Sequence, residues 1–187
     1  MSDWFPLADI FKKSIGYTNT FLGAKPHLDI TDDDYLKFSE LDFIISSEVL
    51  EHVGPPIQLA FDNLAKMLKK GGVLIFSVPY PEGVDYTVER FSELNKYNGY
   101  GFFGTKILVD QTIHGQFQVW NELFFHTDGT ALEIRIFSLQ NLLFHFKKAG
   151  LIDVKVYDEA VLKRGTFWPQ DASHIITARK GRLCDLD

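Results

Sequence analysis

The chain has 187 residues, a formal net charge of −6, one cysteine, and hydrophobic and charged fractions of 45% and 24%. That length suits one domain with a real hydrophobic core, and the acidic balance argues against nucleic acid held by a broad basic patch. A single cysteine excludes a disulfide framework and favours a reducing compartment. No apolar run approaches the roughly 18–20 residues that a membrane span needs, and the N-terminus does not read as a signal peptide. We therefore expect a single cytoplasmic domain over residues 1–187, without membrane contact.

The N-terminal quarter predicts a short helix over residues 4–13, with Asp3 as its N-cap. The β-branched and aromatic segment Tyr17–Phe21 predicts a short strand. The aspartates of residues 32–34 are typical of a solvated loop or of a helix N-terminus.

Two apolar strands flank an amphipathic helix in the next segment. Leu41–Ser46 and Val73–Val78 are short continuous apolar runs, typical of strands buried on both faces of a parallel sheet. Between them, one helical stripe is formed by Ile57, Ala60, Phe61, Leu64 and Leu68. Lys69–Gly72 supplies cations and glycine at the predicted helix end. This order predicts a right-handed βαβ unit.

Residues 81–130 interrupt this alternation of strands and helices. They predict an insertion that forms a lid or a substrate wall. Within it, residues 107–112 and 116–120 flank a His-Gly pair and predict a β-hairpin. Aromatic side chains in or near this part would form either an acceptor pocket or a small separate core. They are Tyr80, Trp120, Phe124, Phe125 and Trp168.

The sheet pattern resumes near the C-terminus. Ser138 is expected to cap a helix that closes at Lys147–Gly150. Residues 152–157 alternate as a half-buried strand, and residues 174–178 predict a last strand. We expect a frayed tail over residues 181–187.

Three segments together resemble the class I S-adenosylmethionine-dependent methyltransferases, and within that family the group called methyltransferase type 11/12-like. They are LDIT at residues 28–31, DFIISSEVLEHV at residues 42–53 and LKKGGVLIFSVPY at residues 68–80, and the helix and strand of residues 138–157 resemble that family's last pair. The resemblance implies an α/β, three-layer, doubly wound Rossmann-like sheet. It also implies S-adenosylmethionine as cofactor and methyl transfer to a small-molecule acceptor.

The family's glycine-rich turn after its first strand has no counterpart here. The one G-x-G-x-x-G, at residues 99–104, follows a polar stretch and precedes a strand-like segment, so its context does not fit. The family's first strand would pair beside Leu41–Ser46, and without it that strand edge is unpaired. We therefore expect the chain to be an N-terminally truncated member of the family. Alternatively, Tyr17–Phe21 moves inward, or a second copy or another partner covers that sheet edge. A non-catalytic remnant or binding module is the alternative function.

The resemblance implies a cofactor site on two segments. Asp29 would accept a hydrogen bond from the adenine amine and Ile30 would pack on the ring, whereas the alternative is a local aspartate turn. Ser46, Ser47 and Glu48 would line the cofactor near its sulfonium at the end of a central strand. Alternatively, Ser47 caps a short helix.

His52 and His126 are the candidate catalytic residues, as general bases for an acceptor that loses a proton. A structural role is the alternative for each histidine. Glu48, Glu51 and His52 have i, i+3, i+4 spacing, and some RNA-terminal methyltransferases bind a divalent metal with such a cluster and a further histidine. Gly54 and two prolines limit the helix to about one turn, and we predict no metal site.

Overall fold

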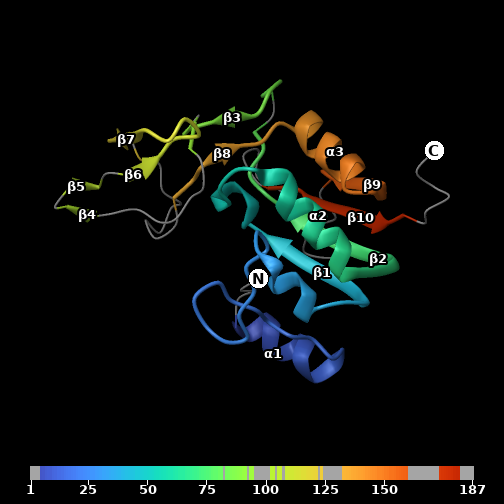
Figure 1. Cartoon of the computed structure of the whole chain (residues 1–187). Helices are drawn as coiled ribbons and strands as arrows, with labels where there is room; N and C mark the ends of the chain where they lie inside the picture. Colours follow the sequence, from blue (N-terminus) through green and yellow to red (C-terminus); the bar gives the residue numbers. More distant parts are fainter. Residues whose placement is uncertain are drawn as a thin grey trace.

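The structure is a computed structural model that describes residues 5–81, 83–91, 93–94, 102–103, 105–106, 108–121, 123, 132–159 and 173–181. Its main sheet has the strand order β1-β2-β10-β9 (Figure 1). β1 (Leu41–Ser47) and β2 (Leu68–Ser77) are parallel. β10 (Ile175–Lys180) runs antiparallel to β2 and to β9 (Leu151–Tyr157). The predicted α/β fold is confirmed.

Two helices cover the same face of this sheet. α2 (Ile57–Met67) and α3 (Leu139–Lys148) meet through Phe61 and Phe146, whose ring centroids are 5.4 Å apart. Both rings also pack on Phe76 of β2, at 5.8 and 5.2 Å. These three aromatic side chains are fully buried and form the centre of the hydrophobic core. Ser138 caps α3 as predicted, accepting a hydrogen bond of 3.2 Å from the Asn141 amide.

β2 begins within the segment predicted to end the preceding helix. α2 ends at Met67, and Leu68 already pairs with Leu41, while the next pair joins Phe43 to Val73. The intervening residues therefore bulge out of the ladder. A Cβ atom at Gly72 would lie 2.8 Å from the Leu41 carbonyl oxygen, so the close backbone approach requires glycine there.

The N-terminal segment contacts the outer edge of β1 without pairing with it. α1 (Phe5–Ser14) is followed by Tyr17, which stacks on Phe43 of β1 with ring centroids 6.3 Å apart. The predicted strand over Tyr17–Phe21 is wrong, because only an isolated bridge between Phe21 and His27 forms there. A cleft of about 210 Å³ separates this segment from β1. In the described part of the chain, β1 is thus an outer strand.

Among the residues that the structure describes in and just after the insertion, three small antiparallel pairs lie beside one end of the main sheet (Figure 1). They are β3 (Val88–Glu89) with β8 (Arg135–Ile136), β4 (Phe102–Phe103) with β5 (Thr105–Lys106), and β6 (Leu108–Gln111) with β7 (Phe117–Trp120). The last pair is the predicted hairpin. Trp120 packs on a second core that includes Phe91 and Leu132, so its role here is structural. Of the other aromatics named above, Tyr80 is buried in the main core, while residues 124, 125 and 168 lie outside the described residues.

Two short 3-10 helices complete the described chain: η1 (Asp33–Lys37) follows the acidic loop, and η2 (Leu50–His52) follows β1. None of the helices that the structure describes has the length and apolar character that a membrane crossing requires.

Candidate functional site

A chain of hydrogen bonds joins the carboxyl ends of β1 and β2. Ser47 and Ser77 are the last residues of these parallel strands and pair in register, with their Oγ atoms 2.9 Å apart. Ser77 donates to Oε1 of Glu48 at 2.8 Å. Each hydroxyl has one hydrogen, so Ser47 must donate to Ser77. The two hydroxyl groups therefore donate one after the other, Ser47 to Ser77 and Ser77 to the Glu48 carboxylate.

A third hydroxyl completes this set. Ser173, just before β10, donates to Oε2 of Glu48 at 2.9 Å. Because β10 is antiparallel to β2, its first residues lie at the edge where β2 ends. Both carboxylate oxygens of Glu48 are thus hydrogen-bonded, which holds the side chain in one orientation.

The Glu48 backbone is strained at this point. Its φ angle is +50°, in the left-handed region that non-glycine residues rarely adopt. Its amide donates to the Ser77 carbonyl at 2.9 Å, which ties the residue to the end of β2. Such strain costs on the order of 1–3 kcal/mol and is concentrated at functional sites in proteins.

The structure gathers two of the three predicted strand-end residues into this cluster. Ser47 and Glu48 belong to it, whereas Ser46 points into the core, has no exposed surface, and its Oγ makes no hydrogen bond with the described residues. Ser77 and Ser173 were not predicted. Ser77 had a usable signal, since it ends the neighbouring parallel strand, but nothing in the sequence near Ser173 indicates its position.

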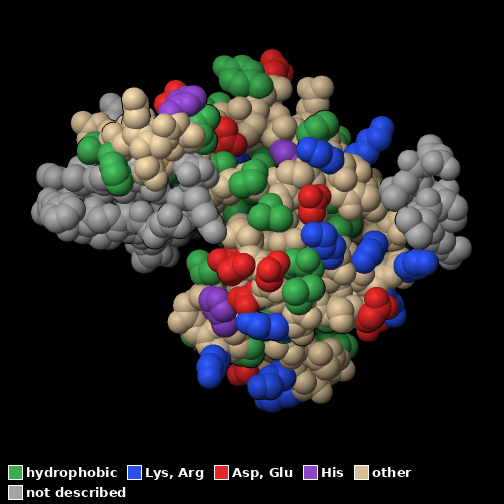
Figure 2. Space-filling view, viewed as in Figure 1, with side chains coloured by type: hydrophobic (Ala, Val, Ile, Leu, Met, Phe, Trp, Pro, Cys, Tyr) green, Lys and Arg blue, Asp and Glu red, His purple; other side chains and the backbone are tan. Residues whose placement is uncertain are grey.

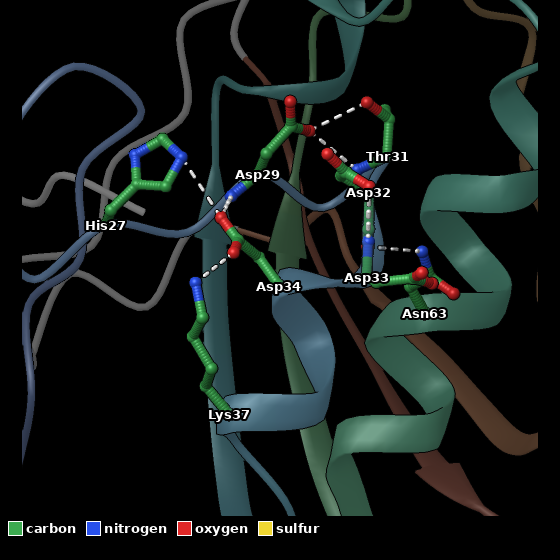
Figure 3. Close-up of polar contacts among 8 residues, drawn as sticks. All are labelled: His27, Asp29, Thr31, Asp32, Asp33, Asp34, Lys37 and Asn63. Carbon is green, nitrogen blue, oxygen red and sulfur yellow. Dashed lines mark hydrogen bonds and ion pairs between the residues drawn. The ribbon is translucent and has the colours of Figure 1, made fainter.

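The acidic loop that contains Asp29 is bound to α2 (Figure 3). Oδ1 of Asp29 accepts hydrogen bonds from the amide and the hydroxyl of Thr31, both at 2.7 Å. Asn63 of α2 donates to the Ile30 carbonyl at 2.9 Å, and the Ile30 side chain is only 5% exposed. Asp29 therefore makes the local turn, and its adenine-binding role stays a prediction.

Asp34 is the centre of the polar contacts in this loop (Figure 3). Its Oδ2 lies 3.0 Å from Nε2 of His27 and accepts from the Asp29 amide at 3.2 Å, and its Oδ1 pairs with Lys37. The hydrogen bond from Lys37, followed by that from the Asp29 backbone, lowers the pKa of Asp34. The loop is therefore ordered around an ionised carboxylate.

The η2 turn is held by the segment that returns from the insertion. The Ile134 amide donates to the Glu51 carbonyl at 2.8 Å, and the Arg135 guanidinium donates to the Leu50 carbonyl at 3.1 Å. Nδ1 of His52 lies 2.8 Å from the Leu132 carbonyl oxygen. The candidate base His52 thus sits where the main sheet and the insertion meet.

Glu51 is buried in this turn with no exposed surface. Neither carboxyl oxygen has a hydrogen-bond partner in another described residue, and Oε1 lies 3.5 Å from Nε2 of His52. Burial raises the pKa of Glu51 from 4.5 to about 8. The residue's own backbone amide lowers it, the charges of Glu48 and Glu133 raise it further, and that of Arg135 lowers it. Glu51 is therefore mostly protonated at neutral pH.

The possible metal ligands Glu48 and Glu51 have different surroundings, one among serines and one buried beside His52. Within the ranges that the structure describes, no three His, Cys, Asp or Glu side chains gather as metal ligands would. His126, the other predicted base, lies outside the described residues. The absence of a metal site and the role of His126 stay predictions.

A family model described as a methyltransferase domain matches residues 8–156. The chain belongs to this methyltransferase family. The mixed parallel and antiparallel sheet agrees with the Rossmann-like fold expected of it. No curated protein sequence matches this chain.

Several solved methyltransferases are similar in part. The CurJ carbon methyltransferase matches at 14% identity with a TM-score of 0.47, over 83% of this chain and 34% of that chain. The Burkholderia thailandensis 1,6-didemethyltoxoflavin-N1-methyltransferase was solved with 1,6-didemethyltoxoflavin and S-adenosylhomocysteine bound. It matches at 12% identity with a TM-score of 0.43, over 83% of this chain and 49% of that chain. Human N-acetylserotonin methyltransferase, solved with S-adenosylmethionine, matches at 15% identity with a TM-score of 0.42, over 83% of this chain and 33% of that chain. The chain spans about a third to a half of the length of these proteins.

Membership of the family implies S-adenosylmethionine as cofactor. The donor carries positive charge on its sulfonium and on its amino group. The Glu48 cluster offers a carboxylate whose two oxygens are already oriented by hydroxyls, at the carboxyl ends of two parallel strands, where ligands of open α/β sheets bind. The residues present therefore fit a cationic group of the cofactor.

Proposed function

We propose that this methyltransferase transfers a methyl group from S-adenosylmethionine to a small-molecule acceptor. The observation that carries the proposal is the Glu48 carboxylate, held between Ser77 and Ser173 at the ends of the central strands. When bound, the cofactor supplies an electrophilic methyl group on a cationic sulfur. Ser47, Ser77 and Glu48 are the residues of this chain that would face it.

Glu48 would contribute through its fixed negative charge. Two hydroxyl donors orient the carboxylate, and the strained backbone holds it at the strand end without further reorganisation. A positive group beside it would be attracted more strongly than in bulk water, because the cluster is partly buried.

Asp29 would serve the adenine end of the cofactor. Its Oδ1 is engaged by Thr31, so the exocyclic amine would donate to Oδ2. The anchoring of the loop by Asn63 would fix the position of this oxygen. Ile30 would support the loop from the core rather than cover the adenine ring, since so little of it is exposed.

The surface charge supports a small-molecule acceptor rather than nucleic acid. On the face shown in Figure 2, acidic and basic side chains are both present over the described surface, and the whole chain is acidic. A second copy or another partner would pair with the outer edge of β1, where backbone groups lack a neighbouring strand in the described chain.

Calorimetric titration with S-adenosylhomocysteine tests this proposal. We expect micromolar-class binding to the wild-type chain and at least about tenfold weaker binding to Glu48→Gln, since a charged contact is worth about 1.4 kcal/mol or more. Glu40→Gln is the matched control, because it removes one exposed carboxylate at the amino end of β1. No heat at high ligand concentration, with folded protein, would overturn the proposal and favour a non-catalytic scaffold.

A further inference from the structure

A cavity of about 410 Å³ lies where the insertion meets α2 and α3. Its volume falls within the range of about 300–1,000 Å³ that is typical of small-molecule sites. It shares no residue with the Glu48 cluster. An apolar wall with a few polar groups is the usual composition of a ligand pocket, so the polar groups decide which ligand fits. The apolar side chains of the wall come from the segment that begins α2 and from the insertion, and they are Pro55, Pro56, Ile57, Phe91, Leu94 and Ile113.

His145 of α3 offers a hydrogen-bond acceptor to this cavity. Nε2 of Gln58 donates to Oδ1 of Asp62 at 2.7 Å, which places the amide oxygen Oε1 beside Nδ1 of His145, also at 2.7 Å. Because an amide oxygen can only accept, Nδ1 carries the hydrogen. Burial, followed by the charges of Arg135 and Lys148, lowers the pKa of His145 and favours the neutral ring. Nε2 of the neutral ring keeps its lone pair, and it makes no hydrogen bond with the described residues.

Two glutamates add negative charge to the same cavity. Oε1 of Glu89 accepts a hydrogen bond of 2.8 Å from Nε of Arg135, while Oε2 has no partner among the described residues. Glu93 is exposed, and its backbone carbonyl accepts a hydrogen bond of 2.9 Å from the Ile113 amide. Within the described part of the chain, no ion pair or hydrogen bond engages its carboxylate. Oxygen acceptors of both side chains are therefore available to a ligand, in addition to Nε2 of His145.

Among the described residues of the cavity wall, the side-chain donors are already used or buried. Both amide hydrogens of Gln58 have acceptors. The Arg135 guanidinium is 1% exposed, and its Nε and Nη1 donate to Glu89 and to two backbone carbonyls. Nη2 of Arg135 lacks a partner among the described residues, but it is buried and offers almost no surface to a ligand. An anionic ligand would thus find no accessible side-chain donor on these residues and would be repelled by Glu93.

We propose that this cavity binds an organic amine, with its apolar body against the wall and its ammonium group directed to His145, Glu89 and Glu93. An ammonium group has three hydrogens and no acceptor, so it complements a set of groups that can only accept. Its positive charge is attracted by the two carboxylates, more strongly beside an apolar wall than in open water. The inference uses none of the residues assigned to the cofactor, so it does not rest on the proposed function.

Three probes with the same apolar body test the charge preference of the full chain without cofactor. At neutral pH phenethylamine is a cation, 2-phenylethanol is neutral and 3-phenylpropanoate is an anion. In nitrogen-15 NMR titrations we expect phenethylamine to bind at least about tenfold more tightly than 2-phenylethanol, because hydrogen bonds to charged groups are the stronger ones. The anion should bind most weakly. Phenethylamine should also shift the Nε2 signal of His145, while the signals of His27, which lies outside the cavity, stay unchanged.

Glu93→Gln removes one negative charge from the cavity and should weaken phenethylamine binding by about twofold to fivefold, with 2-phenylethanol unaffected. The matched control Glu40→Gln removes an exposed carboxylate outside the cavity and should change neither affinity. Equal or tighter binding of the alcohol or the anion, or binding of none of the probes, would overturn the proposal. Amine binding that leaves the His145 signal unmoved would do the same.

If Glu93→Gln does not fold, the order of the three probes on the wild-type chain and the His145 signal decide. The titrations involve no S-adenosylhomocysteine. Their outcome is therefore independent of the calorimetric titration that tests the proposed function.

Discussion

Ser173 donates a hydrogen bond of 2.9 Å to Glu48, although 125 residues separate them in the chain. The contact exists because β10 runs antiparallel between β2 and β9 and so begins at the edge where β1 and β2 end. It joins the last strand of the sheet to the residue that we propose faces the cofactor. Changes near β10 should therefore affect ligand binding.

Replacing Ser173 by alanine tests this relationship. In Ser173→Ala, Oε2 of Glu48 loses its donor, and the carboxylate is held by Ser77 alone. A hydrogen bond to a charged group is worth about 1.5–3 kcal/mol, and partial exposure reduces this value, so we expect affinity for S-adenosylhomocysteine to fall roughly fivefold to tenfold. Ser14→Ala, which removes an exposed hydroxyl contact on α1, should leave it unchanged. Equal affinities in calorimetry would contradict a role for Ser173.

Glu51 should make folding stability decrease with increasing pH. Its pKa rises from 4.5 to about 8 on folding, so between these values the folded chain retains a proton that the unfolded chain releases. The free energy of unfolding should then fall by at most about 1.4 kcal/mol per pH unit from this group. Urea denaturation between pH 5 and pH 8 measures this dependence.

The Glu51→Gln chain is the reference for that experiment, because His145 titrates in the opposite sense. Burial, followed by the charges of Arg135 and Lys148, lowers the pKa of His145, so its contribution to stability is lost as pH falls. Subtracting the Glu51→Gln curve leaves the contribution of Glu51. Parallel curves for the two proteins would show that Glu51 has an ordinary pKa.

A methyl group at Gly72 should destabilise the fold. The new Cβ would meet the carbonyl oxygens of Leu41 and Lys69 at 2.8 and 2.9 Å, and both are backbone atoms. We expect Gly72→Ala to lower stability by about 2 kcal/mol, equivalent to roughly 4–8 °C in Tm for a chain of this size. Gly23→Ala meets no atom within 4 Å and should change Tm little. Similar Tm values for both variants would be inconsistent with the close approach of β1 and β2.

Asn63 should couple the stability of α2 to the acidic loop. In Asn63→Ala the buried Ile30 carbonyl loses its side-chain donor, at a cost of about 1–3 kcal/mol. Amide hydrogen exchange in residues 29–34 should accelerate relative to that in α3, and S-adenosylhomocysteine should bind more weakly if Asp29 contacts adenine. Lys66→Ala, on the same helix, removes a partly exposed hydrogen bond to Asn63 and the contact of the ammonium with the Tyr35 ring, and should cost less than about 1 kcal/mol. Unchanged exchange in the loop would argue against this anchoring role.

The elements with a regular apolar period were predictable from sequence. The strand β1, the helices α2 and α3 and the cap at Ser138 agree with their predicted positions within a few residues, whereas β2 begins at Leu68 instead of Val73. The failures lie where a tertiary contact overrides local preference. Tyr17 stacks on Phe43 instead of joining a strand, and Lys69–Gly72 bulges from β2 because Leu68 already pairs with Leu41.

For the site, the sequence by itself determined that Ser47 and Glu48 end a buried strand, because an apolar run followed by polar residues is a local pattern. It also placed Glu51 and His52 in the short turn that follows. Only the tertiary structure decided that Glu48 is surrounded by Ser77 and Ser173 while Glu51 is buried beside His52. The physical reason is that hydrogen bonding and desolvation depend on neighbours brought from distant strands, which no local period of the sequence records.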